Sequence, residues 1–110
     1  MPRTTRPYSV VFDAAARRDL ENIFDYIGSR AGSTIAERFT TRLYQYCASL
    51  SHTPERGTRR NELRPGLRTI GYKRRATIVF RVDRTKRTVV ILGVYYGGQN
   101  YADDFKDAED

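Results

Sequence analysis

Three runs of β-branched and aromatic residues dominate the second half of the chain. They span residues 67–72, 76–82 and 88–96, and such residues suit a pleated, half-buried surface. A basic cluster separates the first two runs, and a polar linker of a length that fits a hairpin loop separates the last two. The pattern predicts a three-stranded antiparallel sheet. The nearly continuous apolar stretch at 89–94 predicts a central strand that is covered on both faces, and Gly97 and Gly98 end it.

Apolar residues at helical spacing predict two helices in the first half. A short strand precedes them over residues 8–12, where apolar side chains alternate. The Asp13 carboxylate caps the first helix, because it can accept the free amide hydrogens of the first turn. Gly32 suits the position after that helix. The second helix is predicted to start with a capping box at residues 34–37. It is predicted to end at Thr53, because the residue before a proline avoids the helical conformation. The stripes are Leu20, Ile23, Phe24 and Ile27, then Ile35, Phe39, Leu43, Tyr46 and Leu50.

The predicted fold is therefore α+β. A strand and a helical hairpin precede a three-stranded antiparallel meander, and the helices pack on one face of the sheet. The 110 residues form a single domain, with a core over about residues 8–101 and an acidic C-terminal tail at 102–110. Residues 55–66 form a basic loop. We expect the tail from Asp103 onward to lack order without a partner.

Positive charge is concentrated in one block. The net charge is +7, and twelve of the 20 Lys and Arg residues lie between positions 56 and 87, opposed there only by Glu62 and Asp83. Such a block favours an acidic partner, either nucleic acid or an acidic protein, over a merely solvated face. No run is long enough to span a membrane, and the N-terminus lacks the apolar stretch of a signal peptide. The lone Cys47 fits a reducing compartment, so we expect the cytoplasm.

Residues with catalytic chemistry are few. His52 fits a role at a helix end, Cys47 a core position, and Asp13, Asp19 and Asp25 a solvated helix surface. No spacing typical of metal ligands occurs, and we expect neither metal nor cofactor. Four arginines could stabilise charge on RNA and four tyrosines could stack on bases, although residue physics alone slightly favours structural roles. They are Arg68, Arg74, Arg75 and Arg81, and Tyr72, Tyr95, Tyr96 and Tyr101.

Three motifs resemble the RelE/ParE superfamily of bacterial toxins. They are LRPGLR at 63–68, GYKRR at 71–75 and ILGVYYGGQ at 91–99. The resemblance runs from Tyr8 to Tyr101 and is to the ParE, or plasmid-stabilisation, branch. The fold of that superfamily agrees with the element order predicted above.

The resemblance implies a toxin of a type II toxin–antitoxin system. RelE-like members cleave mRNA on the ribosome with basic residues, whose approximate positions here carry Thr77 and Gly97, while only Tyr101 matches their terminal tyrosine. Neither Thr77 nor Gly97 can place a positive charge on the scissile phosphate. The resemblance therefore implies a non-enzymatic inhibitor of DNA gyrase. The alternatives are a ribosome-dependent mRNA endoribonuclease and a non-toxic binding module.

The superfamily also implies a small, acidic, ParD-like antitoxin whose C-terminal segment wraps the toxin. We expect the antitoxin to bind a basic rim of the toxin. We expect no sequence-specific DNA binding by this chain itself. Tyr95 and Tyr96 point to opposite faces of a strand, so one can anchor in the core while the other presents an exposed ring to a target. The predicted antitoxin-binding residues are Arg68, Tyr72, Arg74, Arg75 and Arg81, and the predicted toxicity residues are Tyr95, Tyr96, Gln99 and Tyr101.

Overall fold

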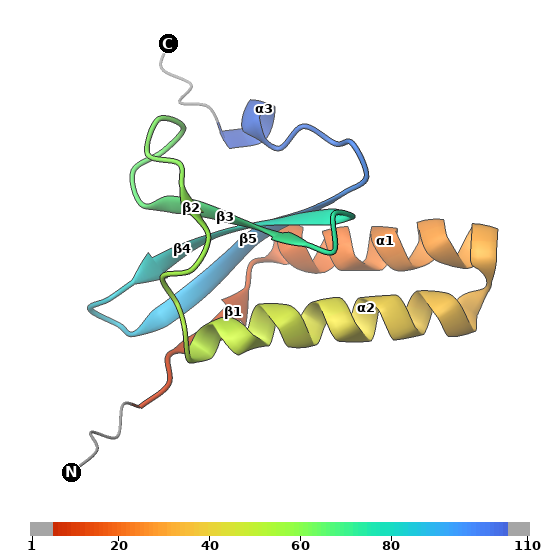
Figure 1. Ribbon diagram of the computed structural model, residues 1–110, viewed down its shortest axis with the longest axis horizontal. Coiled ribbons are helices and arrows are strands. Elements are labelled where there is room, and N and C mark those ends of the chain that lie inside the picture. Colours follow the sequence, from red (N-terminus) through yellow and green to blue (C-terminus); the bar gives the residue numbers. More distant parts are fainter. Residues whose placement is uncertain (1–5, 106–110) are drawn as a thin grey trace.

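The computed structural model describes residues 6–105 as a helical hairpin packed on one face of a five-stranded sheet (Figure 1). This arrangement confirms the predicted α+β class. The elements are β1 (Ser9–Phe12), α1 (Ala14–Ala31), α2 (Ser33–Ala48), the 3-10 turn η1 (Ser49–Ser51), β2 (Thr58–Arg59), β3 (Leu67–Tyr72), β4 (Ala76–Asp83), β5 (Thr88–Tyr96) and α3 (Ala102–Phe105).

The sheet has the order β1-β5-β4-β3-β2. The meander β3-β4-β5 is antiparallel, as predicted. Two features lie beyond the prediction. Strand β1 pairs in parallel with β5, with Ser9 opposite Thr88, and the short β2 pairs with β3 inside the stretch that was expected to be only a loop.

The predicted helix caps differ from those observed. Asp13 occupies the position before α1, but its side chain makes no capping hydrogen bond, and its amide instead donates to the Ile91 carbonyl at 2.9 Å. The capping box at 34–37 is not formed, because α2 already begins at Ser33 and no side chain caps it. A single residue, Gly32, joins the helices at a φ of 96°, which a glycine adopts readily. The second helix ends at Ala48 and continues only as η1, short of the predicted end.

The main core lies between the helical hairpin and the sheet. Ile23, Ile27, Leu43 and Leu50 are buried, while Leu20, Phe24, Phe39 and Tyr46 are partly buried against the same cluster. These positions confirm the predicted stripes with one exception. Ile35 is 47% exposed, and Ala36 takes the buried position beside it. Cys47 is fully buried, as expected of a core residue.

A second, smaller core covers the opposite face of the sheet. Phe105 of α3 is 7% exposed and packs against Leu67 and Val79, with Tyr95 and Tyr101 partly buried around them. Strand β5 is therefore covered on both faces, as predicted. The expected lack of order is wrong for residues 103–105, which turn back onto the sheet; residues 106–110 lie outside the described part. Among residues 6–105 no helix is long and apolar enough to cross a membrane.

Candidate functional site

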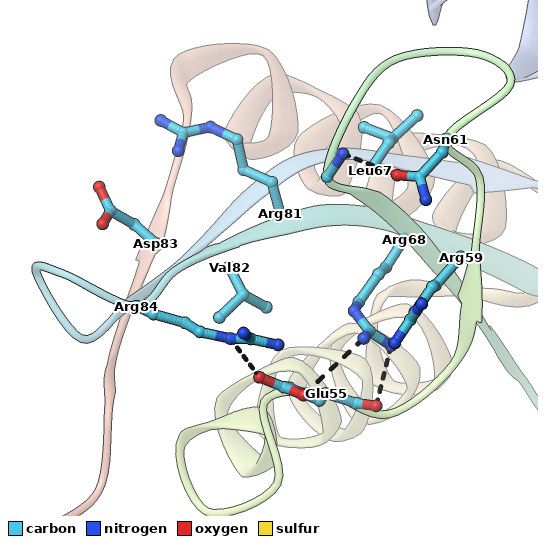
Figure 2. Close-up of a pocket in the computed structure, with 10 residues that line it drawn as sticks. Glu55, Arg59, Asn61, Leu67, Arg68, Arg81, Val82, Asp83 and Arg84 are labelled. Carbon is cyan, nitrogen blue, oxygen red and sulfur yellow. Dashed lines mark hydrogen bonds and ion pairs between the residues drawn. The ribbon is translucent and has the colours of Figure 1, made fainter.

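A basic groove lies beside β3 and the outer end of β4 (Figure 2). It has a volume of about 600 Å³, and we call it the arginine groove. The Arg68 guanidinium is largely buried there and donates from Nη1 to the backbone carbonyls of Glu55, at 2.9 Å, and Arg56, at 3.3 Å. The residues that line the groove are Glu55, Arg59, Asn61, Gly66, Leu67, Arg68, Arg81, Val82, Asp83 and Arg84.

Glu55 neutralises part of the arginine groove. Its Oε2 lies 2.6 Å from Nε of Arg84, and its Oε1 lies 4.0 Å from Nη2 of Arg68. Figure 2 shows Arg81 pointing away from this carboxylate. Within residues 6–105, Arg59 and Arg81 form no ion pair, so the groove retains positive charge.

The turn between β3 and β4 carries a second cluster of cations. Lys73 and Arg74 have φ values of 51° and 59°, and the Arg75 amide donates to the Tyr72 carbonyl at 2.9 Å. Two central residues with positive φ are typical of a tight hairpin turn, where Asn-Gly is the usual sequence. All three cations of the turn are exposed. We call residues 73–75 the hairpin tip.

The hairpin tip lies beside the end of β5. Ala76 is opposite Tyr96, and the Gly97 amide donates to the Arg75 carbonyl at 2.8 Å. Arg74 and Arg75, predicted for antitoxin binding, therefore adjoin the segment predicted for toxicity. Arg68 and Arg81 belong instead to the arginine groove, roughly 13 Å or more along the strands. The structure divides the predicted antitoxin residues between two clusters.

Tyr72 does not face solvent. Its ring is only 6% exposed and packs on Phe39 and Tyr46, with centroid separations of 5.8 and 5.0 Å. Its observed role is in the main core, which is a correction to its placement on a binding rim.

Tyr95 and Tyr96 lie on opposite faces, as predicted, but neither presents a free ring. Tyr96 contacts Tyr26 and Phe39 on the helix side. Tyr95 contacts Tyr101 and Phe105 in the second core. The exposed ring at this end is Tyr26 of α1, which is 48% exposed and was not singled out from the sequence. Its position in the sequence, one residue before the buried Ile27, does not by itself mark Tyr26 as a site residue.

Gln99 and Tyr101 hold the segment after β5 in place. The Gln99 Oε1 atom accepts the Tyr96 amide hydrogen at 2.9 Å. Tyr101 packs in the second core. The Tyr95 hydroxyl donates to Oδ2 of Asp104 at 2.8 Å, and burial together with this carboxylate raises the Tyr95 pKa. Among the predicted toxicity residues, Gln99 is therefore the most exposed, and its amide already has a structural partner.

Asp19 of α1 is a site residue that the sequence analysis placed wrongly on a solvated surface. Its Oδ2 accepts the Val94 amide hydrogen at 2.9 Å, and desolvation by burial raises its pKa despite that hydrogen bond. Asp19 lines a hollow of about 370 Å³ together with Tyr96 and Gly97. The sequence could have indicated this, because residues four apart share a helix face and Asp19 precedes the buried Ile23 by four residues.

Groups with ordinary catalytic chemistry are not assembled in the described part of the chain. His52 is exposed after η1. Burial raises the pKa of the Cys47 thiol to about 12, so the thiolate nucleophile is absent at neutral pH. Among residues 6–105 no group of His, Cys, Asp and Glu side chains is placed to hold a metal ion.

The fold is similar to that of solved toxin and toxin–antitoxin structures from three organisms. A chain of the chromosomal ParDE system from P. aeruginosa is 22% identical with a TM-score of 0.72, and the match covers 84% of this chain and 99% of that one. A chain of the RelBE2 toxin–antitoxin complex from Mycobacterium tuberculosis is 26% identical with a TM-score of 0.65, covering 87% and 98%. A mutant of E. coli RelE in the free state is 19% identical with a TM-score of 0.61, covering 90% and 93%. The molecule thus has the RelE/ParE toxin fold.

The family follows from the sequence itself. The family model described as the ParE toxin of the type II toxin–antitoxin system, parDE, matches residues 10–101. No curated protein matches the sequence. The chain belongs to the ParE toxin family of type II toxin–antitoxin systems.

Proposed function

We propose that this toxin inhibits DNA gyrase by binding it, without catalysis of its own, and that a cognate antitoxin neutralises it in the cytoplasm. The observation that carries the proposal is the lack of positive charge around Thr77. By approximate alignment, Thr77 stands where RelE-like toxins have a catalytic cation. Thr77 lies opposite Gly71 on β3 and Tyr95 on β5, so its cross-strand neighbours carry no positive charge.

The sheet face that contains Thr77 is also unsuited to an RNA phosphate. Thr77 and Val79 share this face because alternate residues of a strand point the same way, and Val79 is covered by Phe105. The nearby Tyr95 hydroxyl is bonded to the Asp104 carboxylate. An incoming phosphate would meet a negative charge where catalysis requires a positive one. These contacts support a binding toxin over a ribonuclease.

The proposed antitoxin is a small, acidic, ParD-like protein. The net charge of +7 and the two cation clusters favour an acidic segment that wraps the toxin. The similar chain from M. tuberculosis comes from a toxin–antitoxin complex, which supports a partner of this kind. We propose that Arg68 and Arg81 in the arginine groove, and Arg74 and Arg75 at the hairpin tip, contact it.

The proposed gyrase contact is the end of β5 and the segment that follows. Tyr95, Tyr96 and Tyr101 support this segment from both faces of the sheet, and Gln99 fixes its path. Gly97 and Gly98 are exposed, and a Cβ atom built on either would meet no atom within 4 Å. A partner backbone can therefore approach closely here.

Conditional expression in bacteria tests the proposal. We expect filamentous cells and a DNA-damage response, and inhibition of supercoiling by purified gyrase when the purified chain is added. Rapid translation arrest with codon-linked mRNA cuts would instead assign the ribonuclease function. Normal growth would assign a non-toxic binding module.

Variants locate the contact within the same assay. Gln99→Ala and Tyr96→Ala should each reduce toxicity at least tenfold while the protein still folds. The matched control is Gln45→Ala, an exposed amide on α2 that should stay fully toxic. Full toxicity of both folded site variants would contradict the assignment to this segment.

A further inference from the structure

The cations of the hairpin tip form no ion pair with a carboxylate in the described part of the chain, in contrast to Arg68 and Arg84 of the arginine groove. Arg68 and Arg84 share Glu55. Within residues 6–105 no ion pair involves Lys73, Arg74 or Arg75. The tip therefore presents three consecutive, solvent-exposed positive charges that the protein itself leaves uncompensated.

The backbone of the hairpin tip is held by a tight turn and a hydrogen bond to the neighbouring segment. Lys73 and Arg74 both adopt the left-handed region, which is unfavourable for residues with a Cβ atom. The hydrogen bond from Gly97 to the Arg75 carbonyl ties the end of the turn to the segment after β5. Because unfavourable backbone conformations cluster at functional sites, the turn is a candidate for one.

Aromatic rings and a fourth cation continue this surface away from the tip. The Tyr26 ring lies 5.8 Å from the Tyr96 ring, and the Arg30 Cζ atom lies 3.8 Å from the Tyr26 centroid. The surface thus runs from the tip across Gly97 and the rings to Arg30. A cluster of exposed cations on one face is typical of proteins that bind the phosphate backbone of nucleic acids.

We propose that this surface, made of the hairpin tip, residues 96–98, Tyr26 and Arg30, binds the phosphate backbone of duplex DNA. The proposal rests on the proposed function, since gyrase holds the DNA that the toxin would meet. Tyr96 packs against Tyr26 and Phe39 and is not free to stack on bases, so the contacts are to phosphates and carry no sequence specificity. Of the two rings only Tyr26 is exposed, so the surface offers a single strand little stacking, and we assign it to duplex DNA.

Fluorescence anisotropy with a labelled, mixed-sequence 20-base-pair duplex tests the proposal. We expect the purified chain to bind with a Kd on the order of 1–100 μM at moderate salt. Arg74→Gln combined with Arg75→Gln should weaken binding at least tenfold and reduce the slope of log K against log salt by about 1.8, since each lost phosphate contact removes about 0.9. Arg74→Lys with Arg75→Lys, which keeps the charge, should restore most of the affinity.

The matched control is Arg38→Gln with Arg42→Gln, an exposed pair on α2 that has no ion pair within the described chain. This control lowers the net charge by the same amount and should change affinity less than twofold. Equal loss in both double variants, or no duplex binding by the wild type, would overturn the proposal. Tighter binding of an RNA duplex of the same sequence would overturn the assignment to DNA.

Gyrase assays keep this inference separable from the proposed function. A wild type that binds the duplex as expected but leaves supercoiling unaffected would support the DNA surface and overturn the proposed target. A wild type that inhibits gyrase without binding the duplex would overturn the DNA surface and leave the target in place.

Discussion

At the scale of single residues, Asp19 joins two distant parts of the chain. Its carboxylate on α1 accepts the hydrogen bond of the Val94 amide, 75 residues away in sequence. The bond is made where β5 is irregular, since Val79 pairs with Gly93 while Phe80 pairs with Ile91. Asp19 thereby fixes the end of the strand from which the proposed toxicity segment starts.

Asp19→Ala should lower the free energy of unfolding by about 1–3 kcal/mol, because a partly buried amide donor loses its partner. Asp19→Asn retains an acceptor and should lose less. Urea unfolding followed by circular dichroism measures both. The control is Asp25→Ala, an exposed carboxylate on the same helix, for which we expect a change within about 0.5 kcal/mol. Equal effects at the two positions would contradict the role of Asp19.

The raised pKa of Asp19 also predicts a pH dependence. A carboxyl group with a folded-state pKa above its ordinary value of 3.8 binds protons more tightly in the folded state. The free energy of unfolding contributed by this group therefore falls as the pH rises from the ordinary value through the raised one. The unfolding free energy of the wild type minus that of Asp19→Asn should fall as the pH rises over that window and level off above it. A difference that rises with pH would contradict the raised pKa.

At the scale of elements, α3 is the part of the structure that charge patterning concealed. Residues 103–110 contain five acidic residues and one lysine, which is typical of a solvated tail. A single aromatic residue reverses that interpretation for the part up to residue 105, because Phe105 closes the second core over Leu67 and Val79. Because α3 has only four residues, the packing of Phe105 stabilises it more than helix propensity does.

Truncation after Tyr101 should lower the unfolding free energy by about 3 kcal/mol, near the lower end for loss of a buried Phe, since the exposed face can partly rearrange. Binding of the dye ANS should rise as Leu67 and Val79 become accessible. The control is truncation after Phe105, which keeps α3 and should leave both measurements nearly unchanged. Unchanged stability of the shorter chain would mean that α3 contributes nothing to the fold.

At the scale of the whole molecule, two cation clusters lie at different ends of the meander and are proposed to contact one acidic antitoxin. Exposed charges of this kind act mainly on the rate of association and its salt dependence. Their separation along β3 and β4 favours a partner that is extended over the surface, as a wrapping segment is.

Arg81→Glu should slow association with the antitoxin about two- to tenfold at low salt and flatten the salt dependence. Stopped-flow mixing with the purified proposed antitoxin gives both quantities. Arg38→Glu carries the same charge change away from both clusters and serves as the control. An association rate for Arg81→Glu equal to that of Arg38→Glu at every salt concentration would contradict a role for the arginine groove.

Much of the fold could be predicted because hydrophobic periodicity encodes it directly. The meander strands and the buried stripes of both helices follow from side-chain alternation and spacing. The β2 strand could not, because two residues carry no periodicity, and the parallel pairing of β1 is a long-range choice that local pattern does not contain. Gly32 ends the first helix as predicted, but the capping box failed because this one-residue joint left no room for it.

The candidate site was predictable only in part. Charge located the cations, and strand alternation placed Tyr95 and Tyr96 on opposite faces. Sequence could not show that Tyr72 is buried, that Arg68 is separated from Arg74 and Arg75, or that Tyr26 lies beside Tyr96. Each of these depends on how helix and sheet meet in three dimensions.

The pairing of β1 with β5 affects when during synthesis the protein can complete its fold. The ribosome makes residues 9–12 long before their partners at 88–91. Contacts of such sequence separation delay folding. A chain interrupted before residue 88 lacks both this pairing and the segment proposed for toxicity. Translation products that stop before residue 88 are therefore expected to lack the proposed toxicity, and the proposed antitoxin needs to meet only chains that extend beyond that residue.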